Sequence, residues 1–216
     1  MKNKYELFKK IIRECNYDNT YKMAWGKSIV ELSLKHDLSK EKVIIKFDEI
    51  AEKYIKYYWN QIIFFDLKQS TNILKTPIII KYIKELINIY IEKNYELKEI
   101  SKINFENTKI KAAYQQTIEK IVEILKNDVS WRFKIINGKD TEIYNYAKGN
   151  EYIEIDTNLL NEINNNKSEL LNTIDYRWIL ILKSINGYPR NNKKIKLSSD
   201  DKIDKSILNN IRKLLG

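Results

Sequence analysis

Apolar residues recur every three or four positions through most of the chain, which is the spacing of amphipathic helices with one face in a core. Asp48 is placed to cap one of these helices, and Pro77 suits the first turn of the next. The apolar stripes that predict five helices in the first 128 residues are Leu7–Cys15, Trp25–His36, Ala51–Ile62, Ile79–Tyr90 and Ile110–Leu125.

The periodicity changes after residue 128, where aromatic and basic residues alternate. Trp131, Phe133 and Ile135 fall at every second position, with Arg132 and Lys134 between them. Alternation with a period of two is typical of a strand whose two faces differ. We therefore expect a strand with its aromatic face inward and its basic face outward.

Turn residues then predict a small antiparallel meander. Asn137-Gly138 favours a tight hairpin, because both residues accept the positive φ angles that such a turn needs. Return strands are expected over 142–146 and 152–155. A short strand over 43–47 either joins this meander or stands apart.

Two further helices are predicted after the meander. Asp156 can cap a short one, and Ser168 can cap the longest helix of the chain. Gly187 and Pro189 end that helix. A last amphipathic segment covers 203–214.

These elements predict a mainly α fold with a small antiparallel β meander (α+β), in which a helical bundle-like core carries a three-stranded insertion. The boundaries follow the changes of periodicity: a helical lobe over 1–128, the β-meander insertion over 129–156, and a helical segment with a basic C-terminal tail over 157–216. No long low-complexity linker separates them. We expect one compact domain.

Charge adds a preference for polyanionic partners. The 216 residues are 43% apolar, enough for a core, and 39 Lys and Arg against 29 Asp and Glu give a formal net charge of +10. Eight cations against three acids place about half of that charge in 186–216. A Lys-, Asn- and Ile-rich composition also follows from an AT-rich coding bias, so both explanations stay open.

Residue types for most catalytic sites are missing. Cys15 is the only cysteine and His36 the only histidine, which excludes an internal disulfide, the usual zinc sites and imidazole-dependent nucleophiles. No signal peptide or membrane span is visible, so we expect a cytoplasmic protein without membrane partners. We predict no catalytic residue, no metal ligand and no cofactor.

Dispersed carboxylates leave one catalytic alternative open. Asp66 with Glu96 and Lys98 matches a Mg²⁺-dependent nuclease only in its letters, because these residues fall in helical patterns. A second acidic group, at 151–156, lacks an accompanying cation and is better explained as a polar strand face with a helix cap.

Nucleic-acid contact is the better-supported chemistry, because cations neutralise phosphates and flat aromatics stack on bases. Basic and aromatic residues occur together at 21–28, 131–134 and 190–196. The candidate nucleic-acid-binding residues are Lys22, Lys27, Arg132, Lys134, Arg190, Lys193, Lys194 and Lys196.

Four stretches together resemble the N-terminal, non-nuclease region of bacterial HNH endonuclease-domain proteins. They read KYELFKKIIRECNYDNTYKMAWGKSIVEL (4–32), IAEKYIKYYWNQIIFFDL (50–67), GKDTEIYNYAKGNEYIEI (138–155) and DYRWILILKSINGYPRNNKK (175–194). The resemblance implies a helical region with a strand insertion that precedes a C-terminal nuclease module. No Cys or His follows His36, so the HNH module is missing and no catalytic residue can be carried over.

Taken together, these features predict a noncatalytic DNA-binding and positioning domain associated with an HNH-type endonuclease, restriction-like or from a mobile element. Its expected partners are DNA rather than RNA, and a nuclease module or subunit. The alternative is a protein-interaction module or regulator, for example a nuclease subunit or a defence or counter-defence protein, without direct sequence readout. Oligomeric state stays open.

Overall fold

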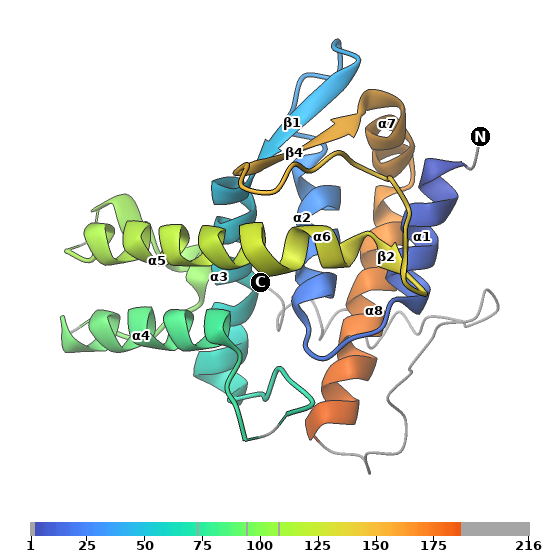
Figure 1. The fold of residues 1–216 in the computed structure, drawn as a ribbon. Coiled ribbons are helices and arrows are strands. Elements are labelled where there is room, and N and C mark those ends of the chain that lie inside the picture. The colour runs from blue at the N-terminus through green and yellow to red at the C-terminus, as the bar shows by residue number, and fades with distance from the viewer. Residues whose placement is uncertain (1–2, 73, 94, 108, 187–216) are drawn as a thin grey trace.

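Helices make up most of the chain, as the apolar periodicity predicts. The structure is a computed structural model that describes residues 3–186 except 73, 94 and 108 (Figure 1). Its long helices are α1 (Lys4–Glu14), α2 (Tyr21–Leu32), α3 (Phe47–Phe65), α4 (Ile78–Glu92), α5 (Lys111–Ile124) and α8 (Lys167–Asn186). Shorter helical elements are the 3-10 turns Ile100–Lys102 and Phe105–Asn107, the π-helical turn Leu125–Val129, α6 (Ser130–Phe133) and α7 (Thr157–Asn165).

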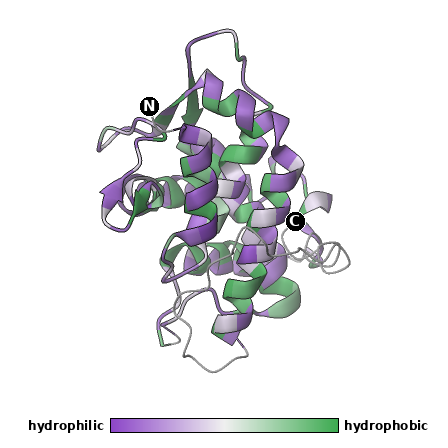
Figure 2. Cartoon of the chain, turned by 90° about the vertical axis from the view of Figure 1, so that its right-hand side faces the viewer, coloured by the Kyte–Doolittle hydropathy of each residue, from purple (hydrophilic) through white to green (hydrophobic). Residues whose placement is uncertain are grey.

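Helix α2 is the centre of the core. It packs against α3, α6, α7 and α8, and all of its residues except Lys22 and Glu31 are buried. The outer helices instead have a hydrophobic and a hydrophilic side, as Figure 2 shows. At Gly26 the neighbours approach so closely that a Cβ atom would lie 2.6 Å from the Cδ1 atom of Ile12. Glycine is therefore required by packing at this point of α2.

Helices α4 and α5 lie side by side and project together from α3 (Figure 1). Aromatic contacts join α4 to α3 and α5 to the 3-10 turn Phe105–Asn107. Trp59 meets Tyr90 edge-on at 5.5 Å between ring centroids, and Phe105 stacks on Tyr114 at 4.3 Å. Such pairs contribute about 0.5–1.5 kcal/mol beyond the area they bury.

Among the residues that the structure describes, the β structure consists of two separate two-stranded antiparallel sheets. Strands β1 (Lys42–Lys46) and β4 (Tyr152–Asp156) pair so that Ile45 lies opposite Ile153, and both side chains are buried. The predicted strands at these two places are confirmed. The second sheet is the hairpin of β2 (Ile135–Ile136) and β3 (Lys139–Asp140).

The Asn137-Gly138 hairpin is also confirmed, because both residues have positive φ angles, 50° and 77°. The expected three-stranded meander does not form, however. Segment 142–146 contributes only an isolated bridge between Asn145 and Glu154. Its two tyrosines contact the π-helical turn instead.

The strand predicted over 131–135 is wrong for residues 131–133, because the chain there continues the line of α5 through the π-helical turn into α6; of the three alternating apolar residues, Ile135 lies in a strand, β2. Residues two apart on a strand share a face, but on a helix they point in different directions. Phe133 is fully buried while Trp131 is 44% exposed. The aromatic alternation therefore marks one core residue and one surface residue.

Some helix ends differ by a few residues from their prediction. Helix α3 begins at Phe47, and its Glu49 carboxylate accepts a hydrogen bond of 3.2 Å from the Lys46 N–H, while Asp48 lies in the first turn. Helix α8 begins at Lys167, one residue before Ser168. Asp156 precedes α7 as predicted, but its carboxylate pairs with Lys4 instead of capping the helix. Gly187, Pro189 and segment 203–214 lie outside the described residues.

Candidate nucleic-acid interface

Lys22 and Arg132 line the same pocket, although they are far apart in the sequence. The pocket has a volume of about 180 Å³, and its walls come from the loop after α1, the start of α2, the π-helical turn and α6. Asp18, Asp128 and Trp131 are also among its polar and aromatic lining residues. Two of the predicted cations are thus brought together beside an exposed indole.

The Trp131 side chain is held in one orientation at this surface. Its Nε1–H donates a hydrogen bond of 3.1 Å to the carbonyl oxygen of Asn127. The Arg132 guanidinium lies over the indole ring, 5.0 Å from the ring centroid, and forms an ion pair of 2.8 Å with Asp128. This cation–π contact adds about 0.5–1 kcal/mol at an exposed site.

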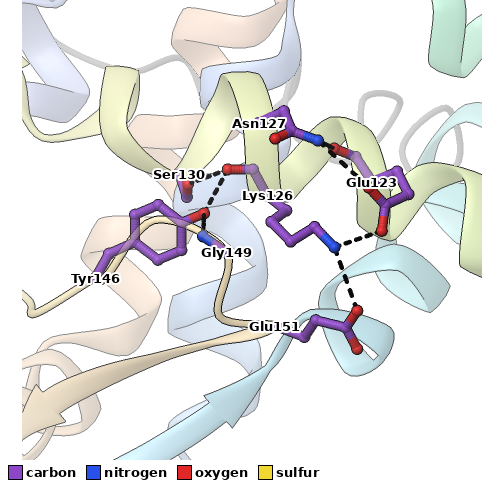
Figure 3. A network of polar contacts seen from close by, with 7 residues as sticks. All are labelled: Glu123, Lys126, Asn127, Ser130, Tyr146, Gly149 and Glu151. Carbon is purple, nitrogen blue, oxygen red and sulfur yellow. Dashed lines mark hydrogen bonds and ion pairs between the residues drawn. The ribbon is translucent and has the colours of Figure 1, made fainter.

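The π-helical turn offers backbone carbonyl oxygens to side-chain hydroxyl groups close to Trp131. A π turn displaces the usual i to i−4 pairing, and such turns occur frequently at functional sites. The carbonyl oxygen of Lys126 accepts hydrogen bonds from the Tyr146 hydroxyl at 2.5 Å and the Ser130 hydroxyl at 3.4 Å (Figure 3). The Tyr144 hydroxyl donates to the Ser130 carbonyl oxygen. Segment 142–146 therefore holds both the π-helical turn and the start of α6, the helix that carries Trp131.

Trp131 also borders a second hollow, of about 460 Å³, on whose wall Lys126, Lys134 and Lys148 lie. The Lys134 side chain is only 14% exposed and pairs with Asp140 at 2.7 Å. The indole is therefore flanked by cations from two adjoining hollows.

Most of these cations have carboxylate partners, so the surface is mixed in charge. Lys126 contacts Glu123 at 2.5 Å and Glu151 at 3.4 Å (Figure 3), and the Glu123 hydrogen bond raises the pKa of the Lys126 ammonium. Within the described part of the chain, Lys22 and Lys148 make no ion pair. Burial lowers the pKa of the half-buried Lys22 ammonium below its ordinary value.

Lys27 does not belong to this interface, which corrects the sequence prediction. Its ammonium is buried between helices and pairs with Asp175 of α8 at 2.7 Å, and it lies over the Tyr57 ring at 5.5 Å. Burial alone would raise the pKa of the neighbouring Glu31, but a hydrogen bond and the charge of Lys53 outweigh it and lower that pKa. Because α2 is surrounded by other helices, Lys27 is a core residue and is not available to a ligand at the surface.

Arg177 was not singled out from the sequence, although it shapes the pocket wall. This α8 side chain is buried, and its guanidinium donates to the carbonyl oxygens of Ile11, at 3.1 Å, of Ile12 and of Cys15. These carbonyls belong to the end of α1, where a helix runs out of its own N–H donors; the Ile11 carbonyl also accepts a hydrogen bond of 3.0 Å from the Cys15 N–H. The bonds hold the end of α1, and with it the loop that begins at Asn16 and lines the pocket.

A protein-family model described as "Domain of unknown function (DUF8808)" matches residues 1–187. The chain belongs to the DUF8808 family. No curated protein and no solved structure matches it. The DUF8808 match includes all residues that line the two hollows beside Trp131, and it ends two residues before the basic segment 190–196.

Near the end of the DUF8808 match, the last residue of α8 is hydrogen-bonded to the loop after α3. The Asn186 side chain accepts a hydrogen bond of 2.8 Å from the Lys68 N–H and donates one of 2.9 Å to the Lys68 carbonyl oxygen. The remaining predicted cations, Arg190, Lys193, Lys194 and Lys196, lie outside the residues that the structure describes.

Four of the five carboxylates considered for a nuclease are engaged in separate ion pairs: Asp66, Glu151, Glu154 and Asp156. Asp66 pairs with Lys84 at 3.2 Å, and Glu154 pairs with Lys42 at 3.7 Å. Among the described residues of this DUF8808 chain, no three His, Cys, Asp or Glu side chains are grouped so that they could hold a metal ion. In the same part of the chain, no helix combines the length and apolar character needed to cross a bilayer.

Proposed function

We propose that this chain is a noncatalytic DNA-binding and positioning domain that works with an HNH-type endonuclease, restriction-like or from a mobile element. The observation that carries the proposal is the convergence of Lys22, Arg132 and the exposed Trp131 on one pocket. Cations with a flat aromatic are the residue types that contact the phosphates and bases of DNA. Cleavage would come from a nuclease module or subunit, in the cytoplasm.

The basic segment 190–196 extends this interface in the proposal. Two residues separate it from the residues that match the family, and it contains four cations and no acid. The resemblance to HNH proteins implies a connector to the nuclease at this point. A connector that also contacts phosphates would keep the nuclease close to the DNA.

The salt dependence of DNA binding tests this function. Each phosphate contact on duplex DNA adds about −0.9 to the slope of log K against log salt concentration. We expect the Lys22→Gln/Arg132→Gln variant to flatten the slope by about 0.9 for each contact that is lost, and Arg190→Ala/Lys193→Ala/Lys194→Ala to flatten it likewise. Fluorescence anisotropy of a labelled duplex over a range of salt concentrations measures the slope.

A matched control separates the proposed contacts from the effect of net charge. Lys93 follows α4 and Lys111 begins α5, at the end of the molecule that lies opposite α1 in Figure 1. The Lys93→Gln/Lys111→Gln variant loses the same two charges and should keep the wild-type slope. Equal slopes for all variants, or no binding of either duplex or single-stranded DNA by the wild-type protein at low salt, would refute the proposal.

A protein-interaction module is the second candidate, and one observation favours it. Phe64 and Phe65 at the end of α3 are 51% and 54% exposed, and Leu74 in the following loop is almost fully exposed. The Phe64 and Phe65 rings are neighbours, 6.4 Å apart between centroids, and contiguous exposed apolar surface marks contact sites for other proteins. Under this alternative, Phe64→Ser/Phe65→Ser abolishes co-purification with a nuclease subunit, and the wild-type protein leaves DNA unshifted.

A further inference from the structure

We infer that Trp131 is a stacking platform for one unpaired base, so that DNA with a single-stranded stretch is the preferred ligand of this surface. The inference rests on the proposed DNA-binding function and adds the class of DNA. The four tryptophans of the chain differ in their exposure to solvent. Trp25, Trp59 and Trp178 are fully buried, whereas Trp131 is 44% exposed.

Exposure alone would mean little, because single apolar residues on a surface are common. The Trp131 ring, however, is also held in place. The bond from its Nε1–H to the Asn127 carbonyl oxygen fixes the indole edge, and the hydrogen bonds from segment 142–146 to the π-helical turn and the start of α6 fix the backbone beneath it. A ring that is already ordered loses little conformational entropy when a ligand stacks on it. This is the property required of a binding platform.

The surroundings of the ring fit a single strand. Trp131 lines two hollows: one carries Lys22 and Arg132, and the other carries Lys126, Lys134 and Lys148. A strand that places one base on the indole would run its neighbouring phosphates into these two hollows. Proteins that bind single strands combine stacking aromatics with cations along the backbone in this way.

A continuous duplex fits less well for two reasons. Its bases are stacked on one another, so none can offer a face to the indole. In addition, the ion pairs of Arg132 with Asp128 and of Lys134 with Asp140 reduce the charge available to phosphates. Because the local electrostatic attraction is partly cancelled, a nonionic contribution from stacking becomes important for affinity.

Arg132 limits the number of stacked bases. Its guanidinium already lies over the indole ring. A base can take the opposite face, which gives a stack of guanidinium, indole and base. One base per site is therefore the expected arrangement.

The change in intrinsic tryptophan fluorescence on DNA binding measures this contact, because the other three tryptophans are buried and out of reach of a ligand. We expect a short oligo-dT to quench the Trp131 emission and to bind more tightly than a closed hairpin duplex at the same salt concentration. Trp131→Leu keeps an apolar side chain but removes the aromatic face. It should weaken oligo-dT binding by about 5- to 150-fold, the range of one base–aromatic stack, and leave duplex binding unchanged.

Trp131→Phe serves as the conservative variant and should retain most of the affinity, since it keeps an aromatic face. Thermal unfolding of both variants checks that the loss of the Asn127 hydrogen bond has not unfolded the site. The inference would be overturned if oligo-dT and duplex bound with equal affinity and Trp131→Leu changed neither. Salt-dependent DNA binding in that case would leave the proposed function standing. Failure of the wild-type chain to bind either DNA would overturn both.

Discussion

Arg177→Met is expected to destabilise the protein strongly, because the arginine joins two helices from inside the core. The guanidinium belongs to α8, is 1% exposed, and donates to three carbonyl oxygens at the end of α1, those of Ile11, Ile12 and Cys15. Methionine has a similar length and fills most of the same space. It offers no hydrogen-bond donor to these oxygens.

The magnitude follows from the groups left without partners. The Ile11 carbonyl oxygen keeps the hydrogen bond of 3.0 Å from the Cys15 N–H, so the carbonyls of Ile12 and Cys15 are the ones that lose their donor. A buried carbonyl that loses its donor costs about 1–3 kcal/mol, so two of them set an upper limit of about 6 kcal/mol. Removing a buried cation recovers part of its own desolvation cost, which lowers the net loss to about 3–5 kcal/mol. Since domains of this kind have a free energy of unfolding of about 5–15 kcal/mol, the variant should lose a third or more of its stability.

Urea unfolding followed by circular dichroism measures the change as a lower midpoint at an unchanged slope. Arg177→Lys should be intermediate, because an ammonium keeps the charge but cannot span three carbonyls. Arg132→Met is the matched control on the surface and should cost about 1 kcal/mol or less, the usual value of an exposed ion pair. If Arg177→Met also cost less than about 1 kcal/mol, the buried arginine would not be what joins α1 to α8.

Two further predictions concern α2. Gly26→Ala should destabilise the protein, because overpacking against Ile12 and Phe133 costs about 1–3 kcal/mol and exceeds the gain in helix propensity of about 1 kcal/mol. Adding Ile12→Val should recover part of the loss in urea unfolding, and no recovery would contradict a clash at this atom. Glu31→Gln should be less stable than wild type at neutral pH, because Lys53 and its neighbours lower the Glu31 pKa in the folded state. As the pH falls below the ordinary value of 4.5, wild-type Glu31 takes up its proton and this difference should shrink; a constant difference would exclude the ionised pair as its source.

The helices could be predicted because their signal is local. An apolar stripe such as Leu7–Cys15 shows its inward face within a few turns, and the Asn137-Gly138 turn depends on two residues alone. The same local reasoning failed at 131–133. There the alternation suits a strand and a helix equally well, and the packing of Phe133 against Phe8 and Trp25 decides for the helix.

The candidate site could be predicted only in part. Lys22 and Arg132 were found from their aromatic neighbours, and the structure places them in one pocket. Lys27 occurs in the same kind of sequence but is buried against Asp175. The role of Arg177 could not be predicted from the sequence, because an arginine on a long helix is usually exposed and hydrated.

The sequence by itself determined the helical stripes, the hairpin turn, the uneven charge and the lack of residues for His- or Cys-based chemistry, since these depend on composition or on residues a few positions apart. The tertiary structure decided which helix is enclosed on every side, and therefore which cation becomes a core residue. It also decided that the loop after α1 and the π-helical turn share a pocket beside Trp131. Such contacts between distant segments depend on how all the helices pack together, and no local pattern records them.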